Sequence, residues 1–420
     1  MPSSDRGAPG PTAAGPLAYS RAVSGSDHRD RCAISGIGAT PFSTDSGRSA
    51  LSLAVEASLA AIADAGLAPG EVDGIVRCDL DSVTHNDLAE ALGLPDLTYW
   101  GTSGPGGAAP GGMIGQAVGA ILSGQATAVL AYRALNGRSG ARFGRGGSGL
   151  GPGGRRRVGG GGKYDEFFVP YGLVAPGHLF SLLARRHMIE FGTTEEQLGH
   201  IALACRARAN ANPAAQMADR PLTMEQYLAG KVISSPLRLF DYCLETDGAC
   251  AVIVTGRERA EDGPHPPALI RAVAQHAGPE PQVGFLYPTL MRKSLTTQTS
   301  KALAATLYRR AGLGPGDVDV AQFYDCFTIT VLVQLEDYGF CAKGEGGPFA
   351  ASGAIDKGGA LPINTSGGHL SEGYLHGLNH IVEGVRQIRG TSTSQVPGAE
   401  VCLVTSGLPV TTSGLILRRG

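Results

Sequence analysis

The chain has 420 residues and a net charge of −2. A chain of this length can form two or three domains with a sizeable core. The small net charge excludes a protein whose overall field attracts nucleic acid or a membrane surface. The absence of an apolar run of about 18 residues excludes a membrane-spanning helix. We therefore expect a globular protein without a nucleic-acid or membrane partner.

Residues 1–30 lack the apolar core of a signal sequence and predict a disordered N-terminal extension. The eight cysteines are scattered, with no C-x-x-C pair, and several lie in strand-like contexts. This distribution predicts reduced, buried thiols in a cytoplasmic protein rather than disulfides or a metal site.

The first half alternates strand-like and helix-like segments. Leu51, Val55, Leu59 and Ile62 share one face of a helix that ends at Gly66. The expected elements are strands at 32–38, 72–76, 126–134 and 247–256, and helices at 49–67 and 113–124. Strand, helix and strand in this order favour parallel pairing.

A nine-residue run shows that the chain is duplicated. AGLAPGEVD at 65–73 returns as AGLGPGDVD at 311–319, with seven identical positions, and both runs follow an Ala-rich helix. A separation of this length is too large for a solenoid, so two copies of a whole domain are expected. The second copy predicts strands at 269–277, 318–327, 399–407 and 411–418, and helices at 300–313 and 375–390.

The first copy carries an insertion that the second lacks, at about 136–246. It opens with a basic, glycine-rich stretch and continues as two helical segments, the second capped by a Thr before Glu195 and Glu196. The glycine-rich stretch suits either a loop near an anionic ligand or a solvated loop. We predict an N-terminal domain at 31–262, with an inserted loop domain at about 136–240, and a C-terminal domain at 263–420.

Three segments resemble the sterol-carrier-type branch of the thiolase superfamily. FYDCFT at 323–328 resembles its His-Asp-Cys-Phe motif, with Tyr324 in the histidine position. NTSGGHLSEGYLHGLNH at 364–380 resembles its glycine-rich loop, but Tyr374 replaces the histidine of Gly-His-Pro. DYCLETDGACAVIVT at 241–255 resembles a third family segment. The resemblance implies duplicated βαβαβαββ domains that form a five-layered αβαβα core with an inserted loop domain.

The departures from the family concern the nucleophile. Thiolases carry a reactive Cys at the start of a buried helix, whereas residues 105–112 here hold no Cys, Ser or Thr. Pro110 and the glycines of this stretch are expected to leave room for a wider cleft. The C-terminal Cys-x-Gly motif is also missing, because 404–410 reads VTSGLPV and Cys402 precedes it. Covalent catalysis through an acyl-Cys is therefore not expected.

A pair of tyrosines remains at the two histidine positions of the family. A phenol can donate a hydrogen bond to developing negative charge and, with a lowered pKa, can move a proton. We interpret Tyr324 and Tyr374 as the catalytic pair, with Tyr374 removing the proton of a substrate hydroxyl and Tyr324 holding or protonating an enolate, or with the roles exchanged.

Other residues near the motifs have two interpretations each. Cys326 lies where the family keeps an acid–base Cys, and it is either a proton shuttle or a buried relic. His369 and His376 either orient a tyrosine, contact the thioester or are structural, and Asp325 is expected to fix its loop. The remaining candidates contact substrate: Gly107, Ala108, Gly367, Gly368 and Gly373, with Arg155, Arg156 and Arg157 opposite the phosphates of coenzyme A.

The pattern resembles the lipid-transfer-protein-like aldolases that cleave steroid side chains. The resemblance implies retro-aldol cleavage of a steroid β-hydroxyacyl-CoA, of the 17-hydroxy-3-oxo-pregnene-carboxyl-CoA type, to a ketosteroid and a short acyl-CoA such as propionyl-CoA. It implies a homodimer bound to a small zinc-ribbon/OB-fold partner, and no cofactor beyond the coenzyme A of the substrate. Two alternatives stay open, namely a thiolase or acyltransferase that uses Cys326 and a non-catalytic lipid-binding subunit.

Overall fold

A computed structural model of the chain describes residues 28–140, 142, 169–173, 175–278, 289, 292–407 and 409–420. Their strands form one nine-stranded sheet in the order β3-β2-β4-β7-β1-β8-β11-β10-β9, and β5 and β6 pair separately. The strands are β1 (Cys32–Ala39), β2 (Gly74–Cys78), β3 (Tyr99–Ser103), β4 (Ala128–Asn136), β5 (Val232–Ser234), β6 (Leu237–Arg238), β7 (Asp247–Gly256), β8 (Ala268–His276), β9 (Val320–Gln322), β10 (Val401–Ser406) and β11 (Thr412–Arg419).

The sheet contains the same strand order twice. In the first half β2 pairs in parallel with β3 and β4, and β7 runs antiparallel between β4 and β1. In the second half β9 pairs in parallel with β10, and β11 runs antiparallel between β10 and β8. An isolated parallel bridge from Ala321 to Ile363 takes the place of β3. The halves join through a short antiparallel β1–β8 contact. This arrangement is the duplicated fold expected from the sequence.

The repeated nonapeptide makes the same hydrogen bonds in both copies. Each run contains a single 3₁₀ turn, in which Glu71 or Asp317 accepts the backbone N–H three residues earlier at 2.8 and 2.7 Å. The final residues, Asp73 and Asp319, accept backbone N–H groups at the start of β4 and β10. The sequence is repeated because it links the same helix, turn and two strands in each half.

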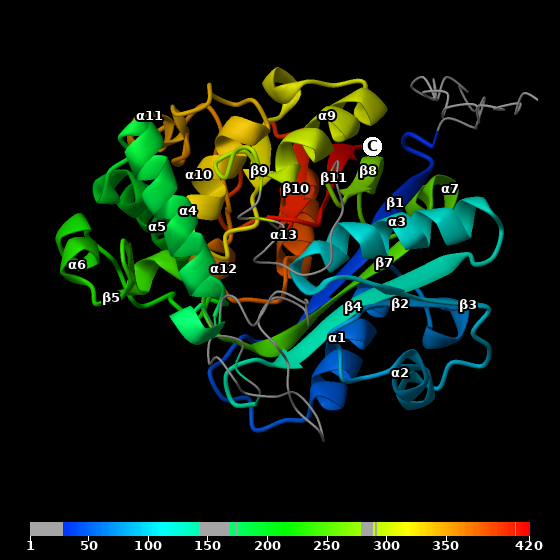
Figure 1. The fold of residues 1–420 in the computed structure, drawn as a ribbon. Helices are drawn as coiled ribbons and strands as arrows, with labels where there is room; N and C mark the ends of the chain where they lie inside the picture. The colour runs from blue at the N-terminus through cyan, green and yellow to red at the C-terminus, as the bar shows by residue number, and fades with distance from the viewer. Residues whose placement is uncertain are drawn as a thin grey trace, which may run out of the picture.

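Helices form three layers around the two halves of the sheet (Figure 1). α1 and α2 cover the outer face of the first half, and α9 and α10 cover that of the second. α3 and α13 lie between the halves and contact strands of both. The helices with these positions are α1 (Ala50–Asp64), α2 (His85–Leu92), α3 (Ala109–Leu122), α9 (Thr299–Ala311), α10 (Thr328–Asp337) and α13 (Leu378–Arg389), and the short helices are α7 (Arg257–Glu261), α11 (Gly346–Ala351) and α12 (Gly368–Ser371).

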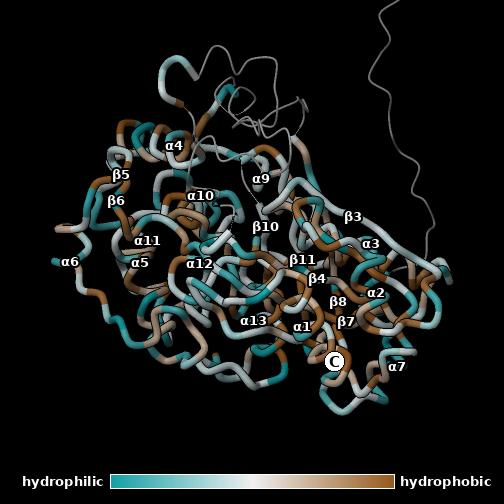
Figure 2. Tube along the Cα trace, turned by 90° about the horizontal axis from the view of Figure 1, so that it is seen from below, coloured by the Kyte–Doolittle hydropathy of each residue, from teal (hydrophilic) through white to brown (hydrophobic). Residues whose placement is uncertain are grey.

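Apolar segments gather along the central strands and α3 (Figure 2). The glycines of α3 belong to this packing. An added Cβ at Gly111 would lie 2.6 Å from Ser413 Oγ, and one at Gly112 would lie 2.1 Å from the Gln275 amide. The expectation that these glycines widen a cleft is wrong, because they allow the helix backbone to approach β8 and β11.

The inserted segment packs against the other copy. α4 (Pro176–Phe191) and α5 (Glu195–Asn210) lie beside helices of the second half, α5 against α10, α11 and α12 and α4 against α10 (Figure 1), and α6 (Met224–Ala229) packs on α5. Thr194 caps α5 by accepting the N–H of Gln197. A segment that continues from the first half thereby covers the second, and it supplies part of the wall of the site.

The N-terminal boundary differs slightly from the expectation. Asp30 is held by Arg271 Nη1 at 2.8 Å, and its N–H donates to Ile270, so the ordered chain begins before residue 31. Residues 1–27 lie outside the described part. Among the described residues no helix is long and apolar enough to cross a membrane.

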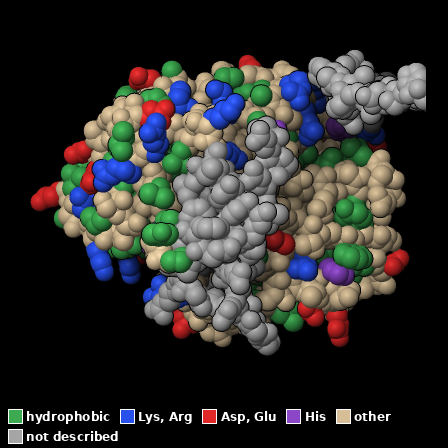
Figure 3. All heavy atoms as spheres, viewed as in Figure 1, with side chains coloured by type: hydrophobic (Ala, Val, Ile, Leu, Met, Phe, Trp, Pro, Cys, Tyr) green, Lys and Arg blue, Asp and Glu red, His purple; other side chains and the backbone are tan. Residues whose placement is uncertain are grey.

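All eight cysteines are described and are free thiols, six of them buried. Acidic and basic side chains are interspersed on the face drawn in Figure 3, as the small net charge predicts.

Candidate active site

The two tyrosines meet at the junction of the halves. Tyr324 lies between β9 and α10, Tyr374 lies between α12 and α13, and their hydroxyl oxygens are 2.8 Å apart. Both side chains line a cavity of about 1300 Å³. The rings meet edge to face with centroids 6.4 Å apart. The structure therefore brings together the two residues that the sequence paired across 50 positions.

Hydrogen bonds hold the backbone of Tyr324 on both sides. Its N–H donates to Thr405 Oγ1 at 2.8 Å, and its carbonyl accepts from Gln334 Nε2 at 2.9 Å. Asn364 clamps the preceding residue, accepting the N–H of Phe323 at 2.7 Å and donating to its carbonyl at 3.0 Å. The Tyr324 hydroxyl is thus positioned by rigid elements rather than by a free loop.

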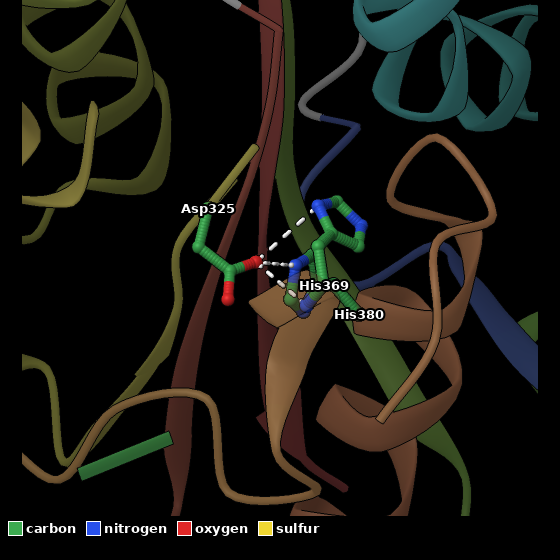
Figure 4. Close-up of side chains that lie close together, drawn as sticks. All are labelled: Asp325, His369 and His380. Carbon is green, nitrogen blue, oxygen red and sulfur yellow. Dashed lines mark hydrogen bonds and ion pairs between the residues drawn. The ribbon is translucent and has the colours of Figure 1, made fainter. Parts of the chain in front are cut away.

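Asp325 forms a buried cluster with His369 and His380 (Figure 4). Its carboxylate accepts from His380 Nε2 at 2.9 Å and from the backbone N–H groups of His369 and Leu370. Burial opposes ionisation, but His369 and these hydrogen bonds hold the pKa of Asp325 at about 2. Two His and one Asp are ligand types for a metal ion, yet the bonds already satisfy the carboxylate, so its role here is to fix the loop.

His369 supports both phenol rings. Its ring meets Tyr324 and Tyr374 edge to face, each with centroids 4.9 Å apart. Burial, reinforced by the proximity of His380, places the pKa of His369 well below its usual value. A buried imidazole in this place orients the pair through its contacts with both rings.

Both tyrosines stay protonated at neutral pH. Burial raises the pKa of each phenol well above the ordinary value. The bond between them acts in opposite directions, raising the pKa of Tyr324 and lowering that of Tyr374, and the Arg133 guanidinium also lowers that of Tyr374. The lowered pKa suggested from the sequence is therefore wrong, because burial raises the pKa of both phenols.

The wall opposite Tyr324 is the stretch that lacks a nucleophile. An added Cβ at Gly107 would lie 2.2 Å from Tyr324 Oη and 2.6 Å from Cζ. Gly107 and Ala108 line the cavity, as predicted. A Cys at residue 107 would occupy the space of the phenol, so the glycine and the tyrosine require one another.

His376 lines the cavity next to Tyr374, with ring centroids 4.9 Å apart. Its Nδ1 accepts a hydrogen bond from Arg133 Nε at 2.9 Å, and Arg133 Nη1 pairs with Asp81. Arg133 and Asp81 are buried. His376 has a φ of 55°, a conformation unusual for a non-glycine residue.

Cys326 lines the cavity but is not an activated thiol. Its Sγ donates to Thr330 Oγ1 at 3.9 Å, and burial raises its pKa far above that of a free thiol. A protonated thiol is a poor nucleophile. This environment fits a buried relic better than a catalytic Cys.

The inserted segment supplies an apolar wall. Phe180 stacks on Phe327 with centroids 4.4 Å apart, and Tyr242 meets Phe327 edge to face at 4.8 Å. Ile233, Leu239 and Phe240 continue the wall towards the surface. The cavity thus combines a polar pair at its inner end with a broad apolar surface.

The other residues predicted to contact substrate were three glycines and a group of arginines. Gly367, Gly368 and Gly373 do not line the cavity, and added Cβ atoms there would meet Ala209, Asp325 and Phe42. These glycines allow close packing behind the site. Arg155, Arg156 and Arg157 lie outside the described residues.

Sequence reasoning missed several residues that position the pair. Neither Thr405, which accepts the N–H of Tyr324, nor Thr246, which accepts the N–H of Tyr374 at 2.8 Å, was predicted. Arg133 gave one usable signal, since a basic residue within an otherwise apolar strand segment requires a buried partner.

Fold and site together define a thiolase-type protein in which glycine and tyrosine replace the covalent machinery. A model of the thiolase C-terminal domain-like family matches residues 288–418. A solved structure described as an Ltp2-ChsH2(DUF35) aldolase has a TM-score of 0.86 and 42% identity, over 93% of this chain and 98% of that one.

Two relatives are similar along nearly the whole chain. A steroid side-chain-cleaving aldolase of Thermomonospora curvata is 44% identical over 92% of this chain and 97% of its own. A 17-hydroxy-3-oxo-4-pregnene-20-carboxyl-CoA lyase of Mycobacterium tuberculosis is 44% identical over 92% and 99%. The chain belongs to the steroid side-chain-cleaving aldolases of the thiolase superfamily.

Proposed function

We propose that the chain is a retro-aldol carbon–carbon lyase that cleaves a steroid β-hydroxyacyl-CoA without a covalent acyl-Cys. The observation that carries this proposal is the pair of neutral tyrosine hydroxyls, 2.8 Å apart, facing a cavity wall with no nucleophile. Cleavage of a β-hydroxyacyl thioester needs one proton removed from oxygen and one delivered to carbon. Two hydrogen-bonded phenols suit that exchange.

The proton balance closes within the pair. The substrate hydroxyl passes its proton to Tyr374 Oη while the Tyr374 hydroxyl passes its own proton to Tyr324 Oη, and the substrate oxygen becomes the ketone carbonyl. The bond between the α and β carbons breaks, and its electrons form the thioester enolate. In the same relay Tyr324 gives its original proton to the α carbon of the enolate, which yields the short acyl-CoA. Each tyrosine ends as it began, so the reaction needs no persistent tyrosinate, in accord with the raised pKa of both.

The direction of the relay follows from the electrostatics. Burial raises the pKa of both phenols, but the Arg133 guanidinium and the hydrogen bond from Tyr324 act to lower that of Tyr374, whereas the same hydrogen bond raises that of Tyr324. Tyr374 is therefore assigned as the acceptor of the hydroxyl proton and Tyr324 as the group that protonates the enolate.

The cavity fits a large acyl group. Its volume of about 1300 Å³ exceeds the roughly 300–1,000 Å³ of ordinary small-molecule sites. The aromatic and aliphatic wall suits a fused-ring body, and the polar end suits the hydroxyl and thioester. With the relatives' names, this supports a 17-hydroxy-3-oxo-pregnene-carboxyl-CoA substrate cleaved to a ketosteroid and propionyl-CoA.

Two partners complete the proposal. A DUF35-type protein of the zinc-ribbon/OB-fold kind binds this chain, as the name of the similar Ltp2-ChsH2(DUF35) structure suggests. A second copy pairs through β3, which is an edge strand of the described sheet and carries Trp100 with 59% of its surface exposed. The free thiols support a reducing cytoplasmic location.

Tyr-to-Phe variants test the reaction in the full chain co-expressed with its partner. Tyr324→Phe and Tyr374→Phe remove one hydroxyl each, and each is expected to lower kcat by about 10²–10⁴. Tyr171→Phe, at an exposed tyrosine outside the cavity, is the matched control. Near-normal cleavage by both folded variants would refute the tyrosine mechanism. A stable acyl adduct on Cys326, detected by mass spectrometry, would instead establish thiolase chemistry, and substrate binding without turnover by the wild-type complex would indicate a lipid-binding subunit.

A further inference from the structure

A buried chain of three polar side chains leads from the first half of the fold to the cavity. Asp81 follows β2, Arg133 lies on β4, and His376 precedes α13. Asp81 pairs with Arg133 and accepts the N–H groups of Ala134 and Cys78 at 3.0 Å each. Arg133 Nε donates to His376 Nδ1 at 2.9 Å. Burying a guanidinium here would be costly without Asp81, which pairs with it.

The contact with Arg133 fixes the tautomer of His376. A guanidinium is always a donor and never an acceptor, so the His376 Nδ1 that it contacts must carry a lone pair. In a neutral imidazole the proton then resides on Nε2. His376 is thereby held as a neutral ring that donates from Nε2.

The donor lies at the former nucleophile position. An added Cβ at Gly106 would be 3.9 Å from His376 Nε2, and the neighbouring Gly107 abuts the Tyr324 hydroxyl. The His376 ring also meets the Tyr374 ring edge to face. A substrate whose hydroxyl and α carbon lie at the tyrosine pair has its thioester oxygen two bonds from that carbon, within reach of His376.

We propose that His376 is a catalytic residue that donates a hydrogen bond from Nε2 to the thioester oxygen as the enolate forms. Arg133 and Asp81 are positioning residues that lock the donor. This inference rests on the proposed retro-aldol function, and it supplies what the tyrosines do not. They move a proton, whereas the negative charge of the enolate resides largely on the thioester oxygen and needs its own preorganised donor.

Paired replacements of His376 separate donation from packing. His376→Leu removes the donor, whereas His376→Gln keeps an N–H near the same place. Both share the backbone strain at this φ, so the difference between them isolates the hydrogen bond. In the full chain with its partner, His376→Leu is expected to lower kcat by about 10²–10³ with KM little changed, and His376→Gln to lose markedly less. His265→Leu, at an exposed histidine, is the control. Equal kcat values for the Leu and Gln variants would overturn the proposal.

A spectroscopic measurement tests the contact without turnover. The infrared carbonyl band of bound propionyl-CoA, identified by ¹³C labelling, is expected at lower frequency than in solution for the wild type and His376→Gln. The shift is expected to disappear in His376→Leu. If the wild type cleaves no β-hydroxyacyl-CoA but the band still depends on His376, the retro-aldol function fails and the donor stands. If cleavage occurs and the band ignores His376, the donor fails and the function stands.

The positioning role has its own readout. In Arg133→Met/Asp81→Asn, which removes both charges together, ¹⁵N spectra of labelled histidine are expected to show His376 as a mixture of tautomers rather than the Nε2–H form alone. A single Nε2–H tautomer in the folded double variant would refute the locking role. The His376 pair decides the catalytic role in either case.

Discussion

Replacing Gly107 by Ala places one methyl group against the proposed proton relay. The added Cβ would lie 2.2 Å from Tyr324 Oη, a distance that carbon and oxygen do not tolerate. The hydroxyl would have to move by about 1 Å before the contact became acceptable. The 2.8 Å bond to Tyr374 would then be lost or lengthened. Gly107 does not have a positive φ, so Ala introduces no backbone strain.

The expected consequence is catalytic. A misplacement of about 1 Å costs roughly 10²-fold in rate, and complete loss of the relay costs up to about 10⁴-fold. The assay is release of the short acyl-CoA from a β-hydroxyacyl-CoA, together with the Tm of each variant. Gly119→Ala is the matched control, because it lies in α3, the helix that follows Gly107, and an added Cβ there would meet nothing within 4 Å.

A double variant sharpens the test. In Gly107→Ala/Tyr324→Phe the hydroxyl is already gone, so the double variant should be no slower than Tyr324→Phe alone. Gly107→Ala with activity within about twofold of the wild type and an unchanged Tm would refute the reasoning. A double variant much slower than either single would show that Gly107 acts through another residue.

Three further results are expected. Because burial raises the pKa of Tyr324 and Tyr374, ultraviolet titration should show neither phenol ionising below about pH 10, and kcat should have no alkaline limb from them; a tyrosinate near neutral pH would contradict this. Because the pKa of Asp325 is held at about 2, its ionised carboxylate stabilises the fold by about 2 kcal/mol above about pH 4, and this contribution is lost as pH falls towards 2. Urea unfolding should therefore show that the difference in free energy of unfolding between the wild type and Asp325→Asn becomes smaller over that range. A difference that stays constant would contradict this prediction. Asn364→Ala leaves the backbone groups of Phe323 unpaired and should lower the free energy of unfolding by about 2–5 kcal/mol. Asn364→Gly tolerates the φ of 44° but also lacks these hydrogen bonds, so it should be nearly as unstable. A stable Gly variant would show that the lost stability of Asn364→Ala comes from φ alone.

Much of the fold could be predicted from the sequence because its determinants are local. The repeat at 65–73 and 311–319 encodes a turn whose hydrogen bonds lie within three residues, and it recurs wherever the same helix must meet the same strand. Periodic apolar residues gave the helices and strands, since each element must bury one face. The tyrosine pair could also be predicted from the sequence, because both motifs are recognisable and each has Tyr where the family has His.

The remaining features depended on contacts between distant segments. Gly107 is required because Tyr324, 217 residues away, fills the space of its missing side chain. Burial raises the pKa of both phenols more than the neighbouring groups lower it, and no local sequence pattern reports that burial. Arg133 and His376 meet across 243 residues, and only that contact turns a loop histidine into a fixed donor. The sequence by itself determined which residues could react, and the tertiary structure decided which of them face one another and in which protonation state.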